Sequence, residues 1–104
     1  MDILCGSQER SASQVAEQLG SVVGSPFEPR ESEYWGQYWL WSRTGIEVRV
    51  VTQPDPEGEL FEEQFPEYHT LVYFEGNDAG FNVPGIPDAL AAVEILRRED
   101  EEDR

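Results

Sequence analysis

The chain has 104 residues, of which 22 are acidic and seven are basic, and its formal charge at pH 7 is -15. About 100 residues suffice for one domain with a modest core, but not for two domains. No apolar run approaches the roughly 20 residues that span a bilayer. The start of the chain lacks the basic and long apolar regions of a secretory signal. We therefore expect a cytoplasmic protein with no membrane role.

The acidic residues are unevenly distributed. Residues 99–104 hold five acids and one arginine, and they predict a disordered acidic tail after a single domain at 1–98. The domain alone keeps 17 acids against six arginines, a charge of -11. Four of its arginines are scattered singly among acids, at Arg10, Arg30, Arg43 and Arg49, so we expect no direct binding to nucleic acid. The charge predicts a protein partner with a basic surface; the alternative is a surface that only keeps the protein soluble.

The N-terminal part of the chain predicts a strand and a helix. Residues 2–5 are a short apolar stretch typical of an edge strand. Residues 11–19 predict a helix, because Ser11 and Gln14 have the spacing of a capping box. Gly20 is the expected stop of this helix.

A hairpin is expected in the middle of the chain, after an irregular connector at 24–29. Residues 34–42 are dense in tyrosine and tryptophan, and residues 46–52 alternate between apolar and charged types. Both patterns are typical of strands.

Two registers of this hairpin are compatible with the pattern. A three-residue loop at 43–45 would bury the tyrosine side and leave the tryptophans on the face of Glu47 and Arg49. A two-residue loop of Thr44 and Gly45 would bury the tryptophans instead. A glycine at the last loop position favours the three-residue loop.

The C-terminal part predicts one more strand and one more helix. Residues 69–75 are apolar on both sides, which is typical of a central strand, and Asn77 and Asp78 indicate a turn. Residues 84–98 predict a helix that begins at prolines and ends at arginines. Its expected core face is Ala89, Leu90, Ala92, Val93 and Leu96. The order β-α-β-β-β-α predicts an α+β fold, a single small domain with an antiparallel sheet of three to four strands and two helices.

Two segments have the composition of a protein-binding surface. Under the favoured register an indole surface lies beside Arg49, and tryptophan, tyrosine and arginine dominate binding hot spots. Residues 54–68 form a long connection with six acids. Phe61 and Phe65 are spaced to anchor one helical turn of it to the sheet, and the acids expected to project outward are Glu57, Glu59, Glu62, Glu63 and Glu67. The alternatives are a covered tryptophan face and a merely solvated loop. The predicted partner-binding residues are Trp35, Trp39, Trp41, Arg49, Asp55, Glu57, Glu59, Glu62, Glu63 and Glu67.

Catalytic patterns are weak. His69 is the only histidine and adjoins an apolar strand without a nucleophile motif, and Cys5, the only cysteine, is expected to be a small buried side chain. The carboxylates show no metal-binding spacing, and we expect no cofactor and no metal. A small enzyme that uses paired carboxylates and His69 would require a pocket where these groups converge.

The sequence thus predicts a small acidic inhibitor that binds a basic protein, such as a toxin or a nucleic-acid-processing enzyme. In size and composition the chain resembles the small acidic immunity proteins of bacterial toxin systems, and this resemblance implies no particular site residue. The alternative is a phage-type anti-defence protein that mimics DNA. A mimic would carry a ladder of acids along an elongated face, whereas an immunity protein would carry a compact patch centred on aromatic residues.

Overall fold

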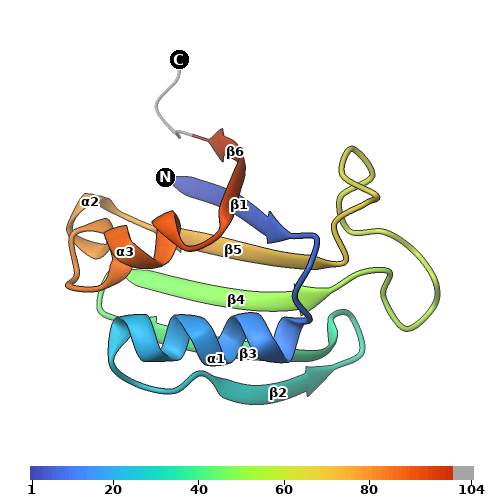
Figure 1. The fold of residues 1–104 in the computed structure, drawn as a ribbon, viewed down its shortest axis with the longest axis horizontal. Helices are drawn as coiled ribbons and strands as arrows, with labels where there is room; N and C mark the ends of the chain where they lie inside the picture. Colours follow the sequence, from blue (N-terminus) through green and yellow to red (C-terminus); the bar gives the residue numbers. More distant parts are fainter. Residues whose placement is uncertain (100–104) are drawn as a thin grey trace.

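A computed structural model describes residues 1–99, which form one antiparallel sheet with helices on one side (Figure 1). The elements in chain order are β1 (Asp2–Ser7), α1 (Ala12–Val23), β2 (Glu28–Ser32), β3 (Gly36–Arg43), β4 (Ile46–Thr52), β5 (Thr70–Gly76), α2 (Asp78–Phe81), α3 (Ile86–Ala91) and β6 (Glu94–Glu99). The strand order is β2-β3-β4-β5-β1-β6. The predicted α+β class is confirmed, but three to four strands and two helices was wrong: residues 1–99 contain six strands and three helices. The predicted tail at 99–104 lies outside the described residues apart from Glu99, which ends β6.

Helix α1 begins as predicted and ends later. The Ser11 hydroxyl accepts a hydrogen bond from the Gln14 backbone, and the Gln14 side chain accepts one from the Ser11 backbone, so the capping box is confirmed. Gly20 is not the stop, because the helix continues to Val23 and ends at Gly24, whose φ is 86°. Gly20 instead allows the connection after α1 to pack closely against the helix, since a Cβ at Gly20 would lie 3.2 Å from the Ser25 carbonyl oxygen.

Strand β2 was not predicted, and only its first two residues fell within the irregular connector expected at 24–29. Its sequence, Glu-Pro-Arg-Glu-Ser, has no apolar alternation, and four of its five residues are exposed. It forms because β3 offers a free edge, along which Glu28 pairs with Leu40 and Ser32 with Gly36. A proline is tolerated on such an edge strand.

The favoured register of the β3–β4 hairpin was wrong. Arg43 pairs with Ile46, so the loop contains only Thr44 and Gly45, and Gly45 still takes the positive φ that it was expected to have. Trp41 lies opposite Val48 and Trp39 opposite Val50. This register turns the larger apolar side chains toward α1.

The C-terminal part differs most from the prediction. Asn77 is the N-cap of the short helix α2 rather than part of a plain turn. The helix expected at 84–98 ends at Ala91, and Glu94–Glu99 forms strand β6 beside β1. Therefore β1 is not an edge strand, and Arg97 and Arg98 do not complement a helix end. The free edge of β1 supplies hydrogen-bond partners that outweigh the weak helical spacing of this segment.

The sheet has a helix face, covered by α1 and α3, and a loop face, covered by the connection 53–69, which we call the strap. The helix-face core contains Ile3, Val15, Leu19, Trp41, Val48, Val50, Val72, Phe74 and Ile86. The smaller loop-face core contains Leu4, Val51, Tyr68 and Leu71, flanked by partly exposed aromatic rings. Within the described residues, none of the helices has the length and apolar character needed to cross a bilayer.

Candidate protein-binding surface

The three tryptophans do not form the single surface that the sequence predicted. Trp41 is 5% exposed and belongs to the helix-face core. Its indole nitrogen donates a hydrogen bond to the Ser25 hydroxyl at 2.8 Å, and its ring stacks on Phe27 at 6.2 Å between centroids. Trp41 is therefore a structural residue.

Trp35 lies on the opposite side of the sheet from Trp41. The positive φ of Gly36, 71°, interrupts the alternation just before β3, so Trp35 turns onto the loop face. There its ring lies 4.9 Å from that of Phe61, and the Arg49 guanidinium lies 5.0 Å from its centroid. Of the three tryptophans predicted to lie beside Arg49, Trp35 is the one whose ring contacts it. Arg49 also forms ion pairs with Glu47 and Glu75.

The strap is held by the buried side chain of Gln53. Its amide nitrogen donates to the backbone oxygens of Phe65 and Tyr68, both at 2.8 Å, and its amide oxygen accepts from the Glu62 backbone at 3.0 Å. One fully buried amide therefore satisfies three backbone groups of a segment that has no strand or helix of its own. Phe61 and Phe65 pack against the loop-face core, as their anchoring role required, although no helical turn forms there.

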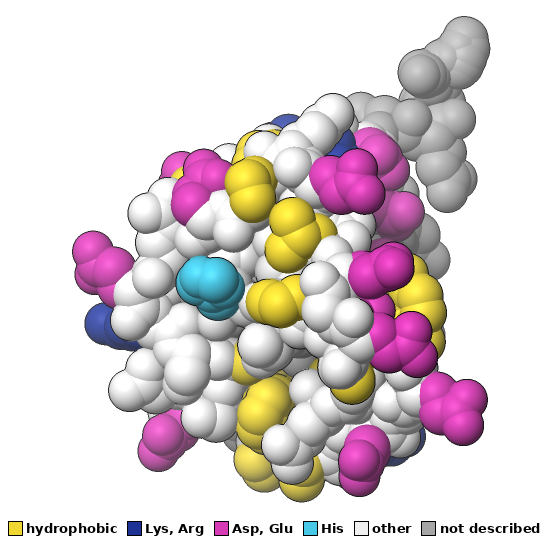
Figure 2. All heavy atoms as spheres, turned by 90° about the vertical axis from the view of Figure 1, so that its right-hand side faces the viewer, with side chains coloured by type: hydrophobic (Ala, Val, Ile, Leu, Met, Phe, Trp, Pro, Cys, Tyr) yellow, Lys and Arg dark blue, Asp and Glu magenta, His cyan; other side chains and the backbone are white. Residues whose placement is uncertain are grey.

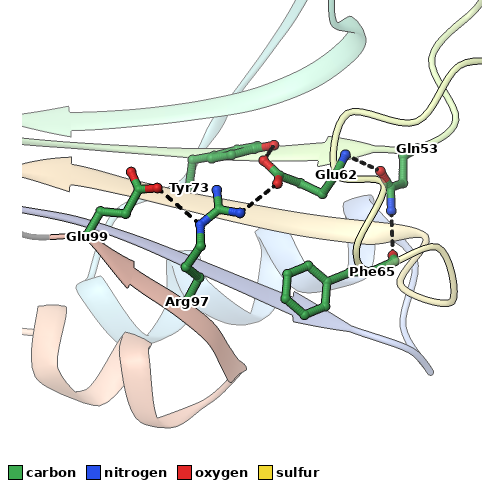
Figure 3. Close-up of polar contacts among 6 residues, drawn as sticks. All are labelled: Gln53, Glu62, Phe65, Tyr73, Arg97 and Glu99. Atoms are coloured by element: carbon green, nitrogen blue, oxygen red, sulfur yellow. Dashed lines mark hydrogen bonds and ion pairs between the residues drawn. The ribbon is translucent and has the colours of Figure 1, made fainter.

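Glu62 was expected to project outward, and this was wrong. Figure 3 shows its carboxylate between Tyr73 and Arg97, with the Tyr73 hydroxyl donating at 2.7 Å and an Arg97 guanidinium nitrogen at 3.1 Å. Arg97 Nε lies 3.2 Å from a Glu99 carboxylate oxygen, a charge contact without hydrogen-bond geometry. Burial, together with the hydrogen bond to Glu62, raises the pKa of Tyr73. This network binds the strap to β5 and β6 and engages both carboxylate oxygens of Glu62.

The remaining acids of the strap differ in role. The Asp55 carboxylate accepts hydrogen bonds from the backbones of Glu57 and Glu59, at 2.9 and 2.8 Å, and so shapes the tip of the strap. Glu57, Glu59, Glu63 and Glu67 are exposed, as expected.

Four predicted residues meet at the end of the sheet where β3 begins and β4 ends. Trp35, Trp39 and Asp55 line a hollow of about 290 Å³. A second, open hollow of about 740 Å³ shares Gly36 and Pro56 with the first and is lined by Glu31, Glu33 and Glu57. We call these two hollows together the acidic end. Trp41, Glu62, Glu63 and Glu67 are not among its lining residues.

Tyr34 is the functional candidate that sequence reasoning missed. Its side chain is 63% exposed, although its ring lies 4.7 Å from that of Trp35 and 5.3 Å from that of Phe61. It was assigned to the strand, whereas β3 begins only at Gly36. The acidic neighbours and the following Trp-Gly pair were the signal for an exposed turn. A view of the strap side shows carboxylates around much of the rim and arginines at only a few points (Figure 2).

The two side chains considered for catalysis, Cys5 and His69, lie far from the arrangement that catalysis would require: Cys5 is buried in the core and His69 is at the surface. Cys5 is buried in the helix-face core, and this burial raises the pKa of its thiol to about 12. The thiol therefore stays protonated at neutral pH and is a poor nucleophile. His69 is exposed at the end of the strap, with Nδ1 3.2 Å from the Gln53 carbonyl oxygen (cyan in Figure 2). In residues 1–99 no three carboxylate, histidine or cysteine side chains are grouped as a metal site requires.

Comparisons of the chain with protein-family models, with curated proteins and with solved structures gave no match. The functional assignment rests on the geometry of the residues described above.

Proposed function

We propose that this protein is a small inhibitor that binds a basic surface of another protein through its acidic end, in the manner of an immunity protein that neutralises a bacterial toxin. The observation that carries the proposal is the meeting of exposed carboxylates and aromatic rings in one place. Glu31, Glu33 and Glu57 line one hollow, and Trp35 and Trp39 line the adjoining one.

The charge balance supports a cationic target. Residues 1–99 hold 18 of the 22 acids, and the ion pairs among these residues engage five of them. Unpaired carboxylates create a negative potential that accelerates the encounter with a positively charged partner. Exposed aromatic rings then supply the apolar contact that slows dissociation. Tyr34 stands beside the carboxylates and has the exposure that this role needs.

The shape favours this function over mimicry of DNA. The described residues measure 36 × 35 × 25 Å, so none of their faces is markedly elongated, whereas a ladder of acids that mimics DNA is expected along an elongated face. The carboxylates at the acidic end instead border an aromatic cluster.

The test screens the protein domains encoded beside this chain for one that is toxic to cells when it is produced alone. Cells that produce the domain should grow when this protein is co-expressed, and the two purified proteins should associate more slowly as salt rises from 50 to 500 mM, because salt screens steering. Replacing Glu31, Glu33 and Glu57 with glutamine should reduce the association rate about tenfold or more.

The matched control replaces Glu9, Asp88 and Glu94 with their amides, which changes the net charge equally at exposed positions elsewhere. Tyr34→Ala should speed dissociation without loss of fold. A failure to protect cells, or an association rate that salt does not change, would contradict the proposal. Equal effects of the two triple variants would move the site away from the acidic end.

A further inference from the structure

A third hollow lies on the helix face of the sheet. It is an open groove of about 650 Å³ between α1 and the β2–β3 side of the sheet. One wall is the side of α1 from Ser13 to Gly24, the other is the connection Ser25–Phe27, and the indole of Trp39 borders it.

The groove lies along the side of α1 that faces the connection to β2. The helix contacts β3, β4 and β5. Pro29 and Glu31 of β2 share the helix-side face with Trp39, because they pair with Trp39 and Gln37. Trp39 is half-buried and borders the groove from β3, whereas none of the residues of β2 lines it.

The walls of the groove are fixed before any ligand arrives. Gly20 touches the connection so closely that a Cβ would lie 3.2 Å from the Ser25 carbonyl and 3.3 Å from Pro26. Ser25 is itself held by the Trp41 indole nitrogen. A preformed groove of this volume can bury an apolar side chain with little cost of reorganisation.

The groove is apolar at its base and polar at its rim, where Glu17 is the one acidic lining residue. Ala16 and Phe27 are buried, and Trp39 is half-buried, whereas Ser13, Ser21 and Glu17 are exposed along the helix. Trp39 also borders the hollow of Trp35 and Asp55, so the groove adjoins the acidic end. Among the described residues, no arginine lines the groove or either hollow.

We propose that this groove receives an apolar side chain from a basic segment of the partner protein, while the flanking cations of that segment contact Glu17 and the acidic end. The inference rests on the proposed function and extends it, because it assigns the partner an apolar anchor and extends the interface from the acidic end onto the helix face. Charge complementarity selects this occupant, because a second copy of this chain, whose net charge is -15, would bring further acids to a region that already holds Glu17 and the acidic end.

Two synthetic peptides provide the probe, acetyl-Arg-Arg-Leu-Arg-Arg-amide and the same peptide with serine in place of leucine. Each is titrated into ¹⁵N-labelled protein, and backbone amide and indole signals are followed by NMR. The leucine peptide should bind about tenfold or more tightly, because burial of one leucine side chain contributes that much. It should shift the Trp39 indole and the amides of Gly20 and Ser21, whereas the serine peptide should shift mainly Glu31, Glu33 and Glu57.

A groove-filling variant, Ser21→Phe, should abolish the advantage of leucine over serine. Its matched control is Ala91→Phe on the exposed side of α3, which should leave the advantage unchanged. Ser21 is exposed, so the variant should fold normally, and the dispersion of the amide spectrum checks this.

The outcomes separate the two proposals. Equal binding of both peptides at the acidic end alone would overturn the anchor groove and leave the proposed function standing. Absence of binding by either peptide would count against both. Groove signals that shift with protein concentration in the absence of peptide would overturn the inference in favour of a second copy.

Discussion

The two faces of the sheet are covered in different ways. The helix face is closed by α1 and α3, which satisfy their own backbone hydrogen bonds, and its core consists almost wholly of aliphatic and aromatic side chains. The loop face is closed by the strap, whose backbone depends on Gln53 and whose middle depends on the Glu62 carboxylate. Apolar packing therefore holds the helix face, whereas a few polar contacts hold the loop face.

This difference relates to where the candidate site lies. A segment without regular structure can present carboxylates and loosely packed aromatic rings at its margin, which a helix packed on a sheet does less easily. The acidic end lies where the strap meets the β2–β3 turn. The helix face supplies the stability, and the margin of the loop face supplies the exposed chemistry.

The largest expected effect comes from the helix-face core. Phe74 is fully buried at the middle of the sheet, and Phe74→Ala should reduce the free energy of unfolding by about 3–5 kcal/mol. This is a large part of the stability of a domain of this size. Urea unfolding followed by circular dichroism measures the loss. A cost below about 1 kcal/mol would show that the helix face is not the main source of stability.

The next effect should be confined to the loop face. Gln53→Ala removes three hydrogen bonds and leaves two backbone carbonyls and one amide without this partner, at a cost of about 2–4 kcal/mol. Hydrogen exchange should accelerate in residues 54–68 and stay slow in α1. The control Gln64→Ala, at an exposed position of the same strap, should change stability by less than about 0.5 kcal/mol. If hydrogen exchange in α1 accelerated as much as in residues 54–68, the two faces would not be stabilised independently.

The two faces should begin to lose stability at different alkaline pH values. Burial raises the pKa of Cys5 on the helix face to about 12, whereas an unfolded thiol titrates near 8.5. Burial likewise raises the pKa of Tyr73 on the loop face above the value of about 10 in unfolded chains. Both shifts favour the protonated folded state, so their stabilisation is complete below the unfolded pKa and is lost as pH rises toward the folded pKa.

The loss should begin near pH 8.5 through Cys5 and gain a second component near pH 10 through Tyr73. Each group contributes at most about 1.4 kcal/mol per pH unit. Cys5→Ala should flatten the stability curve from pH 9 upward, and Tyr73→Phe only above pH 10. Denaturant midpoints across this range check both slopes, and unchanged slopes would show that the two groups are not protected by the fold.

The smallest expected effect compares two neighbouring acids. Glu62→Gln removes the ion pair with Arg97 and should cost about 1 kcal/mol, since Glu62 is largely buried but Arg97 is one third exposed. The exposed neighbour provides the control, because Glu63→Gln should be neutral within about 0.5 kcal/mol. Thermal unfolding at low and high salt resolves the two. Identical melting curves would mean that the network in Figure 3 contributes nothing to closing the loop face.

Local patterns in the sequence predicted the elements whose signals are local. Strand 46–52 was predicted with the bounds that β4 has, and the capping box located the start of α1. In both cases the signal in the sequence is local: the alternation of apolar and charged side chains along β4, and the spacing of Ser11 and Gln14 in the capping box. The exposure of Glu57, Glu59, Glu63 and Glu67 was predictable for the same reason.

The errors occurred where a distant segment decides the structure. Residues 94–99 became a strand because β1 had a free edge, and Glu28–Ser32 became one because β3 had another. Glu62 turned inward because Arg97, 35 residues later, lies beneath the strap. The hairpin register depended on which face α1 would cover, so the tryptophan surface was assigned to the wrong residues.

The outer strands of the sheet restrict what another molecule can add to it. Within the described residues, β2 carries Pro29 and mostly charged or polar side chains, and the pairing of β6 with β1 shifts register between Leu4 and Cys5. Proline and irregular pairing both interrupt the row of amides and carbonyls that would recruit a further strand. The outer strands of the described residues therefore resist the addition of a strand from another molecule, which disfavours fibrous aggregation.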